Sequence, residues 1–406
     1  MIPETFRSLR GFNYRLYAAG ALVSNVGTWM QRIAQDWLVL TQLTDHNATA
    51  VGVVMALQFG PQIVLMPLTG WAADTFDRRK LLIWTQGAMA LLALGLGLLT
   101  AQGLAQLDHV YFFALMLGCV AAFDAPARQA FVSELVGEED LSNAVALNSS
   151  SFNAGRLIGP AVAGVLIPVL GTGGVFLINA ASFAAVLTAL SCLRVHELRA
   201  SLRGPRGRLL DGFRYVWARP DLKAMLLMMF IVATFGLNFP IFISKMAVDV
   251  FHVGSDQFGL LSSMLAIGSV SGALLSASRA RPRADLLWAG AGLFGVGCAL
   301  AALMPAYFLF ALALMLIGVS AQTFTTTVNG CVQMATEPAM RGRVMAILMA
   351  MAWGGTPIGA PLVGWVADHL GARWSLGVGA LAGLVAAWVG LRFLWSDEAR
   401  AESAKS

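Results

Sequence analysis

Ionisable side chains inside a long apolar stretch are the residues of this sequence best placed to do chemistry. Arg32 and Asp36 stand four residues apart in the run 15–40 and therefore share one face of a helix. A buried carboxyl favours its neutral form when it has no partner, and its charged form when an arginine is near. Asp36, with Arg32, is therefore our leading candidate for a group that loads and releases a proton. A self-neutralising Arg32–Asp36 pair is the alternative.

Two further charged positions in apolar runs extend this set. Asp124 and Arg128 are again four residues apart, close to the end of the run 109–131, where gating or helix-end anchoring is favoured over substrate binding. Asp124 is also a proton-coupling candidate. Arg156 has no acid in its own run, and arginine does not give up its proton. Its partner must therefore be Asp36, Asp124 or an anionic substrate; without such a substrate, Arg156 is a tie between helices.

Two glutamines are further candidates for substrate contact, and the sequence has none of the common enzyme motifs. Gln31 and Gln35 lie on the helix face beside Arg32 and Asp36, and we expect them near a substrate. The sequence has no HExxH, GxSxG or P-loop pattern, and its four cysteines form no CxxC pair. We therefore expect no enzyme activity, no cofactor and no metal site, so that energy must come from an ion gradient or the substrate's own gradient.

The composition indicates which elements position these residues. Hydrophobic residues make up 58% of the 406 residues and charged residues only 12%, against about 25% charged in soluble domains. A soluble enzyme is excluded. At about 20 residues per span, we predict an all-α polytopic membrane protein whose spans lie near 15–40, 50–73, 81–102, 109–131, 143–168, 173–193, 224–247, 258–278, 285–303, 306–328, 343–367 and 373–395.

The charge distribution predicts the topology. An even number of spans puts both termini on one side, and basic residues gather on the side of the N-terminus, which is therefore cytoplasmic. The net charge of +5 thus reflects topology, and no nucleic-acid partner is expected. We predict a six-helix bundle over 1–193, a basic linker with an amphipathic helix over 194–223, a second six-helix bundle over 224–395, and a cytoplasmic tail over 396–406.

An internal repeat supports this division. Gly155, Gly159 and Gly164 recur as Gly355, Gly359 and Gly364, at a constant offset of 200 residues, with Pro160 beside one set and Pro361 beside the other. Glycines at this spacing also serve ordinary close packing of membrane helices, but two sets in register indicate a repeated unit. Two six-helix halves are the architecture of a large class of secondary transporters.

The loop between the second and third predicted spans resembles the loop signature of the major facilitator superfamily. The match consists of Gly70, Asp74, Arg78 and Arg79, whereas Asp77 stands where a glycine is common and Thr75 where an arginine is common. The resemblance covers essentially the whole chain and implies a gating latch made of Gly70, Asp74, Asp77, Arg78, Arg79 and Arg128. A turn that only sets topology is the alternative.

The fifth predicted span looks like the glycine–proline motif of superfamily exporters that exchange substrate for protons. Gly155, Gly159, Pro160 and Gly164 carry this match. Together with the stretches 126–136 and 25–44, it resembles the enterobactin-exporter and drug-efflux branch. In the resembled family, spans one, four, seven and ten line a central cavity, which implies substrate contacts from Gln31, Gln35, Asn238, Gln322 and Asn329. Arg156, in the fifth span, is the further candidate for contact with an anionic substrate.

The resemblance implies a secondary transporter that exports hydrophobic or amphipathic small molecules, such as drugs or siderophores, by proton antiport and alternating access. An uptake carrier or a lysolipid flippase on the same fold is the alternative, and a non-transporting membrane sensor is a third. The expected partners are a small-molecule substrate, protons and the lipid bilayer. We expect a monomer in the inner (plasma) membrane. The excess of arginine over lysine, 23 to 4, indicates a bacterial source.

Overall fold

The computed structural model describes residues 4–199, 209–277, 285–338 and 340–403. Within these residues the chain is helical and contains no strand. The elements of the first half are η1 (Glu4–Arg10), α1 (Phe12–Leu38), η2 (Val39–Leu43), α2 (Ala48–Val64), α3 (Met66–Thr75), α4 (Arg78–Ala101), α5 (Leu107–Leu135), α6 (Glu138–Ser191) and η3 (Val195–Glu197).

The second half continues with shorter and more interrupted helices. Its elements are α7 (Leu209–Ala218), α8 (Pro220–Ile231), η4 (Val232–Gly236), α9 (Phe239–Lys245), η5 (Met246–Val250), α10 (Ser255–Ala277), α11 (Asp285–Leu303), α12 (Tyr307–Ala335), α13 (Arg341–Gly354), α14 (Thr356–Leu370) and α15 (Ala372–Ser403). Two of the interruptions, η4 and η5, are single π-helical turns, as is η2 in the first half. Such turns often occur at functional sites.

Membrane-spanning length is common among these helices. In the described part of the chain, nine helical segments are long and apolar enough to cross a bilayer. One of them, α6, has 54 residues and is broken at Gly171, whose φ of +70° places it in the left-handed region that favours glycine. The predicted spans 143–168 and 173–193 lie on the two sides of this break.

The helix that carries the leading candidates, α1, is not among those nine segments. Its composition explains this, because Gln31, Arg32, Gln35 and Asp36 replace apolar residues near its end. Polar and charged residues in a membrane helix face a protein interior or a watery cavity. The least apolar of the long helices is therefore the one in which the sequence places its chemistry.

The chain divides into two compact units. Unit 1 comprises residues 1–45, 57–204 and 254–263, and unit 2 comprises residues 46–56, 205–253 and 264–406. The linker residues 200–208 lie outside the described part of the chain, so the predicted linker 194–223 is described only at its two ends. The helices α2 and α10 each begin in one unit and end in the other.

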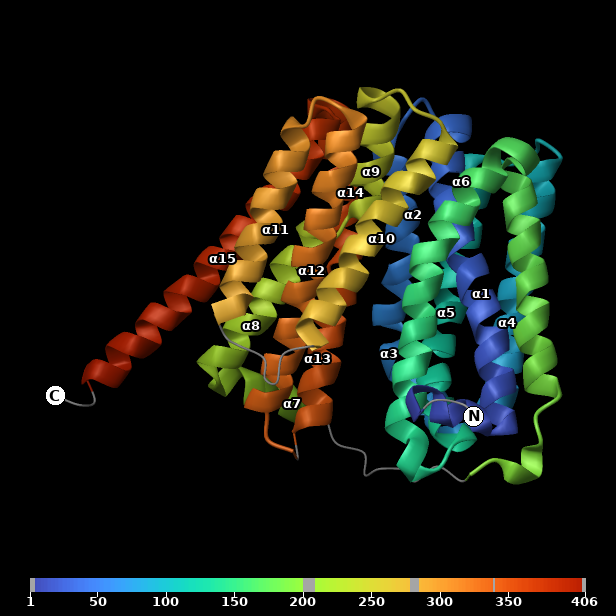
Figure 1. The fold of residues 1–406 in the computed structure, drawn as a ribbon, viewed down its shortest axis with the longest axis horizontal. Coiled ribbons are helices and arrows are strands. Elements are labelled where there is room, and N and C mark those ends of the chain that lie inside the picture. The colour runs from blue at the N-terminus through green and yellow to red at the C-terminus, as the bar shows by residue number, and fades with distance from the viewer. Residues whose placement is uncertain (1–3, 200–208, 278–284, 339, 404–406) are drawn as a thin grey trace. The chain divides into compact units, whose positions relative to one another are not determined.

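Close helix packing forms the core of unit 1. There α1, α4, α5 and α6 lie side by side (Figure 1). A Cβ atom on Gly20 of α1 would lie 2.9 Å from the carbonyl oxygen of Ala185 in α6, so the two backbones meet directly. The aromatic rings of Tyr17 and Phe131 contact each other edge to face, with centroids 5.6 Å apart, and both side chains are buried.

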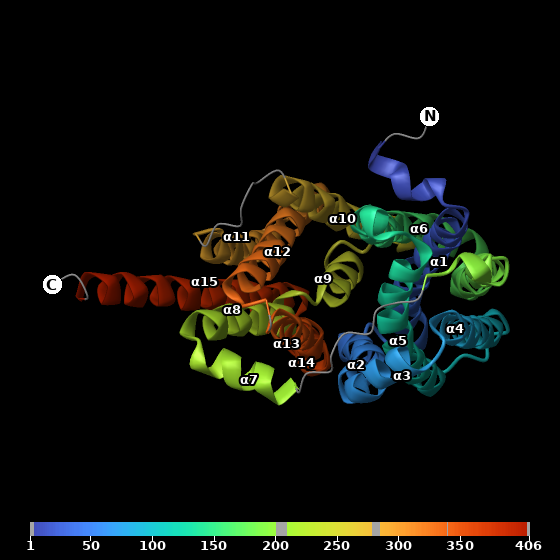
Figure 2. The same cartoon turned by 90° about the horizontal axis from the view of Figure 1, so that it is seen from below.

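Unit 2 is packed by the same means. A Cβ on Gly383 of α15 would lie 2.6 Å from the Cα of Gly295 in α11, which brings these helices together. The amphipathic helix α7 lies beside α8 and α13 (Figure 2). It approaches α13 at Gly212, where an added Cβ would lie 2.9 Å from the Cβ of Arg343. Phe213 and Trp217 on its other side are exposed.

The two glycine sets of the repeat make equivalent contacts. Gly155 and Gly159 pack α6 against Asn25 and Trp29 of α1, and Gly355 and Gly359 pack against Thr234 in η4. Gly164 meets the beginning of α10 at Ser255, and Gly364 meets the beginning of α2 at Ala48. Glycines that are 200 residues apart in the sequence therefore make equivalent packing contacts.

Candidate functional site

Two arginines of unit 1 lie against one tryptophan ring, between α1 and α6. The Cζ atom of Arg32 lies 4.9 Å from the ring centroid of Trp29 and 5.3 Å from that of Phe59 in α2. The Cζ atom of Arg156, from α6, lies 5.7 Å from the same Trp29 ring. The glycine–proline motif positions this cluster, because Gly159 allows α6 to approach the Cβ of Trp29.

Neither arginine is neutralised by direct contact with a carboxylate among the described residues. Asp36 is buried, with 7% of its surface exposed, yet no ion pair within 4.0 Å joins it to Arg32. The Nε atom of Arg32 and the Nε2 atom of Gln35 are buried without a hydrogen-bond partner. The structure therefore brings Arg32, Asp36, Gln35 and Arg156 into one region of unit 1 and leaves their polar atoms available.

Gln31 has a different environment. Its Oε1 atom accepts a short hydrogen bond from Nδ2 of Asn179 in α6, and both side chains are buried. Gly27 of α1 lies against the same Asn179 and against Ser182. Gln31, the residue directly before Arg32, thus ties α1 to α6, and its acceptor oxygen is already occupied by Asn179.

Asp124 belongs to a separate network between α4 and α5. Its Oδ1 atom accepts hydrogen bonds from Thr85 Oγ1 at 2.8 Å and Gln86 Nε2 at 2.6 Å. Its Oδ2 atom accepts two more from Arg128, at 3.2 and 3.0 Å. Both oxygens of the carboxylate accept hydrogen bonds, and among the described residues it makes no hydrogen bond or ion pair with Arg32 or Arg156. This arrangement suits a tie between helices.

The resembled loop signature acts as a brace at one end of unit 1. Arg78 binds Glu134 of α5 at 2.8 Å and donates to the carbonyl of Ala73 at 3.1 Å. Arg79 donates to the carbonyl of Leu190 at the end of α6. Asp77 caps α4 by accepting the backbone N–H of Lys80.

Two features of this signature, at Gly70 and at Arg128, differ from the simplest latch. Gly70 is exposed, and a Cβ there would meet no atom within 4 Å, so no close helix approach occurs at that position in this structure. The side chain of Asp74 lies outside the described residues. Arg128 contacts Asp124 instead of the loop. Glu134, which the sequence analysis did not single out, is the acid that Arg78 binds.

The candidates of the second half lie in unit 2. Asn238 is fully buried between η4 and α9; it donates to the carbonyl of Thr234 at 2.8 Å, and its Oδ1 atom has no partner. Gln322 donates to Thr326 at 3.1 Å, and Asn329 donates to the carbonyl of Thr325 at 2.8 Å, both within α12. Asn238 is therefore the candidate of this set with a free buried acceptor.

The sequence analysis did not single out a further charged cluster in unit 2, which is built around Lys245 in the predicted span 224–247. Lys245 is 5% exposed; its Nζ atom lies 2.8 Å from Asp249 and 3.2 Å from Asp368 of α14. Asp368 also accepts the backbone N–H groups of Ala48 and Thr49 at 2.8 Å each, and the Thr49 hydroxyl at 2.6 Å. Asp368 thus caps the first turn of α2 from another helix.

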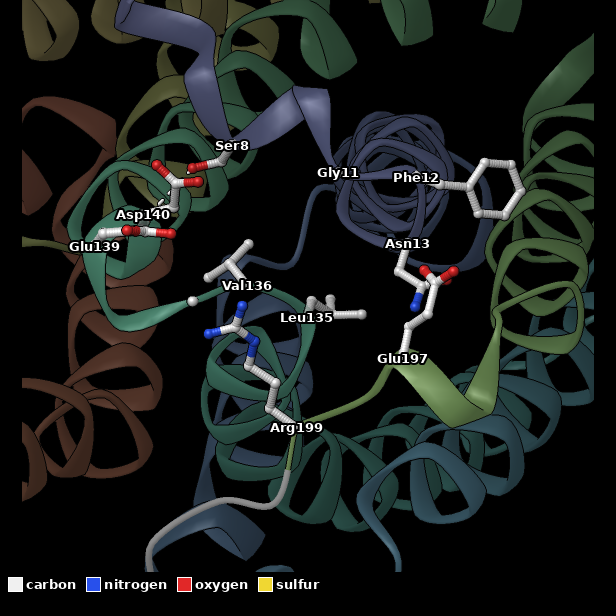
Figure 3. A pocket seen from close by; sticks show the side chains of 11 residues that line it. Ser8, Gly11, Phe12, Asn13, Leu135, Val136, Glu139, Asp140, Glu197 and Arg199 are labelled. Atoms are coloured by element: carbon white, nitrogen blue, oxygen red, sulfur yellow. Dashed lines mark hydrogen bonds between the residues drawn. The ribbon is translucent and has the colours of Figure 1, made fainter.

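A pocket of about 260 Å³ opens at one end of unit 1 (Figure 3). Its wall is formed by η1, the junction of α5 and α6, and the segment that follows η3, including Ser8, Asp140 and Arg199. Ser8 donates to the carbonyl of Asp140 there. No candidate residue from the sequence lines this pocket, and the described residues contain no group of three side chains suited to a metal.

Long apolar helices in a repeated, glycine-packed arrangement, with arginine and aspartate inside the helix bundle, are typical of a polytopic membrane transporter. A bacterial homologue of the human lysosomal transporter Spinster, solved in an inward-facing occupied conformation, has the same fold, with a TM-score of 0.75, 15% identity and 97% of each chain covered. The family model described as transmembrane secretion effector matches residues 4–406. The chain therefore belongs to this family of the major facilitator superfamily.

The sequence matches between this chain and three named relatives cover most of the length of each protein. The staphyloferrin A transporter of Staphylococcus aureus is 28% identical over 85% of this chain and 87% of its own. The enterobactin exporter EntS of Shigella flexneri is 29% identical over 80% and 78%. The multidrug efflux pump Tap of Mycolicibacterium fortuitum is 27% identical over 86% and 88%. All of them are transporters, and none is an enzyme.

Proposed function

We propose that this protein exports amphipathic small molecules in exchange for protons, and that Asp36 is the residue that carries the proton. The observation that supports this role is the burial of Asp36 in α1 without an ion pair within 4.0 Å among the described residues. A carboxyl in such a place can change its protonation without breaking a salt bridge. The siderophore exporter and the multidrug pump among its relatives support export.

The remaining candidates divide into two groups in this proposal. Arg32 and Arg156, with Gln35, bind the substrate beside Trp29 in unit 1. Asn238, with its free buried acceptor, is a separate candidate within unit 2. Asp124 and Arg128, with the loop arginines Arg78 and Arg79, hold helices together through the conformational cycle. Alternating movement of two six-helix halves exposes the site to each side in turn.

The predicted topology belongs to the same proposal. Twelve spans place both termini in the cytoplasm, with bundles at 1–193 and 224–395 joined by the linker 194–223, and the protein acts as a monomer in the inner membrane. Gly171 separates the fifth and sixth spans within α6. The membrane-embedded helices and the bacterial relatives support this placement.

Transport in liposomes tests the proposal. Purified protein is reconstituted with a pH-sensitive dye inside, and rhodamine 6G or a catechol siderophore is added under an imposed pH gradient. We expect substrate-dependent proton movement in the wild type, no such movement in Asp36→Asn, and normal movement in Asp45→Asn, which removes an exposed carboxylate nearby. Substrate flux without proton movement, unchanged by Asp36→Asn, would refute the coupling.

A further inference from the structure

Among the described residues, the positive charges of Arg32 and Arg156 have no carboxylate in direct contact. Both are half-buried, on α1 and α6, and both lie within 6 Å of the Trp29 ring centroid. No hydrogen bond or ion pair of Arg156 occurs among the described residues, and its guanidinium group lies over the indole ring of Trp29 instead. The sequence left Asp36, Asp124 and an anionic substrate as possible partners of Arg156, and neither aspartate is in contact with it.

Two guanidinium groups so placed repel each other. Arginine cannot relieve this repulsion by losing its proton, and an uncompensated cation at membrane depth is costly. The face of an indole attracts a cation, but less strongly than a charged oxygen that also accepts hydrogen bonds. Even with Asp36 ionised, two guanidinium groups against one carboxylate leave one positive charge.

Unpartnered donors show where an anion would bind. The Nε atom of Arg32 is buried with no acceptor, although guanidinium groups normally bind carboxylates or phosphates through two parallel hydrogen bonds. Aromatic surface surrounds it: Trp29 contacts Phe152 of α6 edge to face at 5.5 Å, and Phe59 lies under the guanidinium of Arg32. The cluster therefore offers charge and flat apolar surface together.

From these contacts we propose that Arg32 and Arg156 form an anion-binding site, and that the transported substrate is an organic anion whose flat apolar part lies against Trp29 and Phe59. This inference rests on the proposed transport function and adds the charge of the substrate to it. The anion neutralises both arginines, and the rings provide contact area that tolerates different substrate shapes. A mere interhelical tie leaves the Nε atom of Arg32 without an acceptor.

Two dyes that share a xanthene ring but differ in charge test this site. The binding of 5-carboxyfluorescein, an anion, and of rhodamine 6G, a cation, to the full chain in detergent is measured by fluorescence anisotropy. We expect saturable carboxyfluorescein binding that weakens at least tenfold in Arg156→Gln and in Arg32→Gln. The loss in Arg156→Lys is smaller because the charge remains, and rhodamine 6G binding does not weaken in any of these variants.

The control is Arg194→Gln. Arg194 also lies over an aromatic ring, Phe12 at 4.4 Å, but it is already paired with Glu197, so its loss leaves carboxyfluorescein affinity unchanged. Absence of saturable carboxyfluorescein binding by the wild type overturns the proposal. So does a folded Arg156→Gln that loses thermal stability but binds the dye normally, which is the result expected of a structural tie. If Arg156→Gln does not fold, Arg32→Gln and the wild-type comparison of the two dyes decide.

The binding and transport experiments separate the two proposals. Proton-coupled flux of rhodamine 6G without carboxyfluorescein binding would support the proposed export and refute the anion site. The opposite result is carboxyfluorescein binding that depends on Arg32 and Arg156 but no proton movement in liposomes. It would support the anion site and refute the proton antiport.

Discussion

The cap that Asp368 provides for α2 predicts a measurable local opening. Its carboxylate accepts three hydrogen bonds from Ala48 and Thr49 and pairs with Lys245. Asp368→Ala leaves two backbone N–H groups of α2 without their acceptor and Lys245 with Asp249 alone. Breaking a buried pair costs about 3–5 kcal/mol. We therefore expect the opening free energy of the first turn of α2 to fall by about 3 kcal/mol.

Hydrogen exchange of residues 46–56 measures this opening. A loss of about 3 kcal/mol accelerates exchange roughly 100-fold. Thr49→Val removes only the hydroxyl bond, which contributes about 1 kcal/mol, so exchange rises about fivefold. Asp45→Asn serves as the control because Asp45 is exposed. Unchanged exchange of residues 46–56 in Asp368→Ala would show that the cap does not hold this turn, and that packing at Gly52 and Gly364 holds it alone.

Two further predictions concern packing and the network in unit 1. Gly159→Ala puts a Cβ 2.6 Å from that of Trp29 and should destabilise the protein by about 1–3 kcal/mol, whereas Gly87→Ala, where nothing lies within 4 Å, should stabilise it by up to about 1 kcal/mol. Thermal unfolding in detergent checks both, and equal shifts would contradict the close approach. Asp124→Ala should cost about 3–5 kcal/mol in the same assay, since it leaves Arg128 buried and unpaired; a normal melting temperature would exclude this network as a major tie.

Local sequence patterns were sufficient to predict most of the helices. Apolar runs of span length indicate buried helices regardless of what they pack against, because a bilayer requires internal hydrogen bonding. The 200-residue offset predicted a repeat, and the contacts of Gly155 with Asn25 and of Gly355 with Thr234 have the same form. The π-helical turns were not predicted, since a bulge leaves the hydrophobic pattern intact, whereas the break at Gly171 falls between the predicted spans 143–168 and 173–193.

The candidate site was predictable only in part, because the sequence gives residues on one helix but not their neighbours on another. Spacing placed Arg32 and Asp36 on one face of α1, and the structure adds Phe59 and Arg156 from α2 and α6. Asp368 could not be found in this way, since its partners Thr49 and Lys245 are more than a hundred residues away in the chain. Whether Asp36 carries a proton stays a prediction.

The repeat also shows how two halves with equivalent packing can differ in the polar contacts that hold them. Gly164 and Gly364 are equivalent positions that receive the beginnings of α10 and α2. Four residues further along, the first half has Pro168 where the second half has Asp368. A proline side chain cannot accept hydrogen bonds from the incoming helix, and the α6–α10 contact is a close approach at Gly164 and Gly259. The α2–α14 contact adds a carboxylate and Lys245, and a charged tie in one half only gives the two junctions different opening costs.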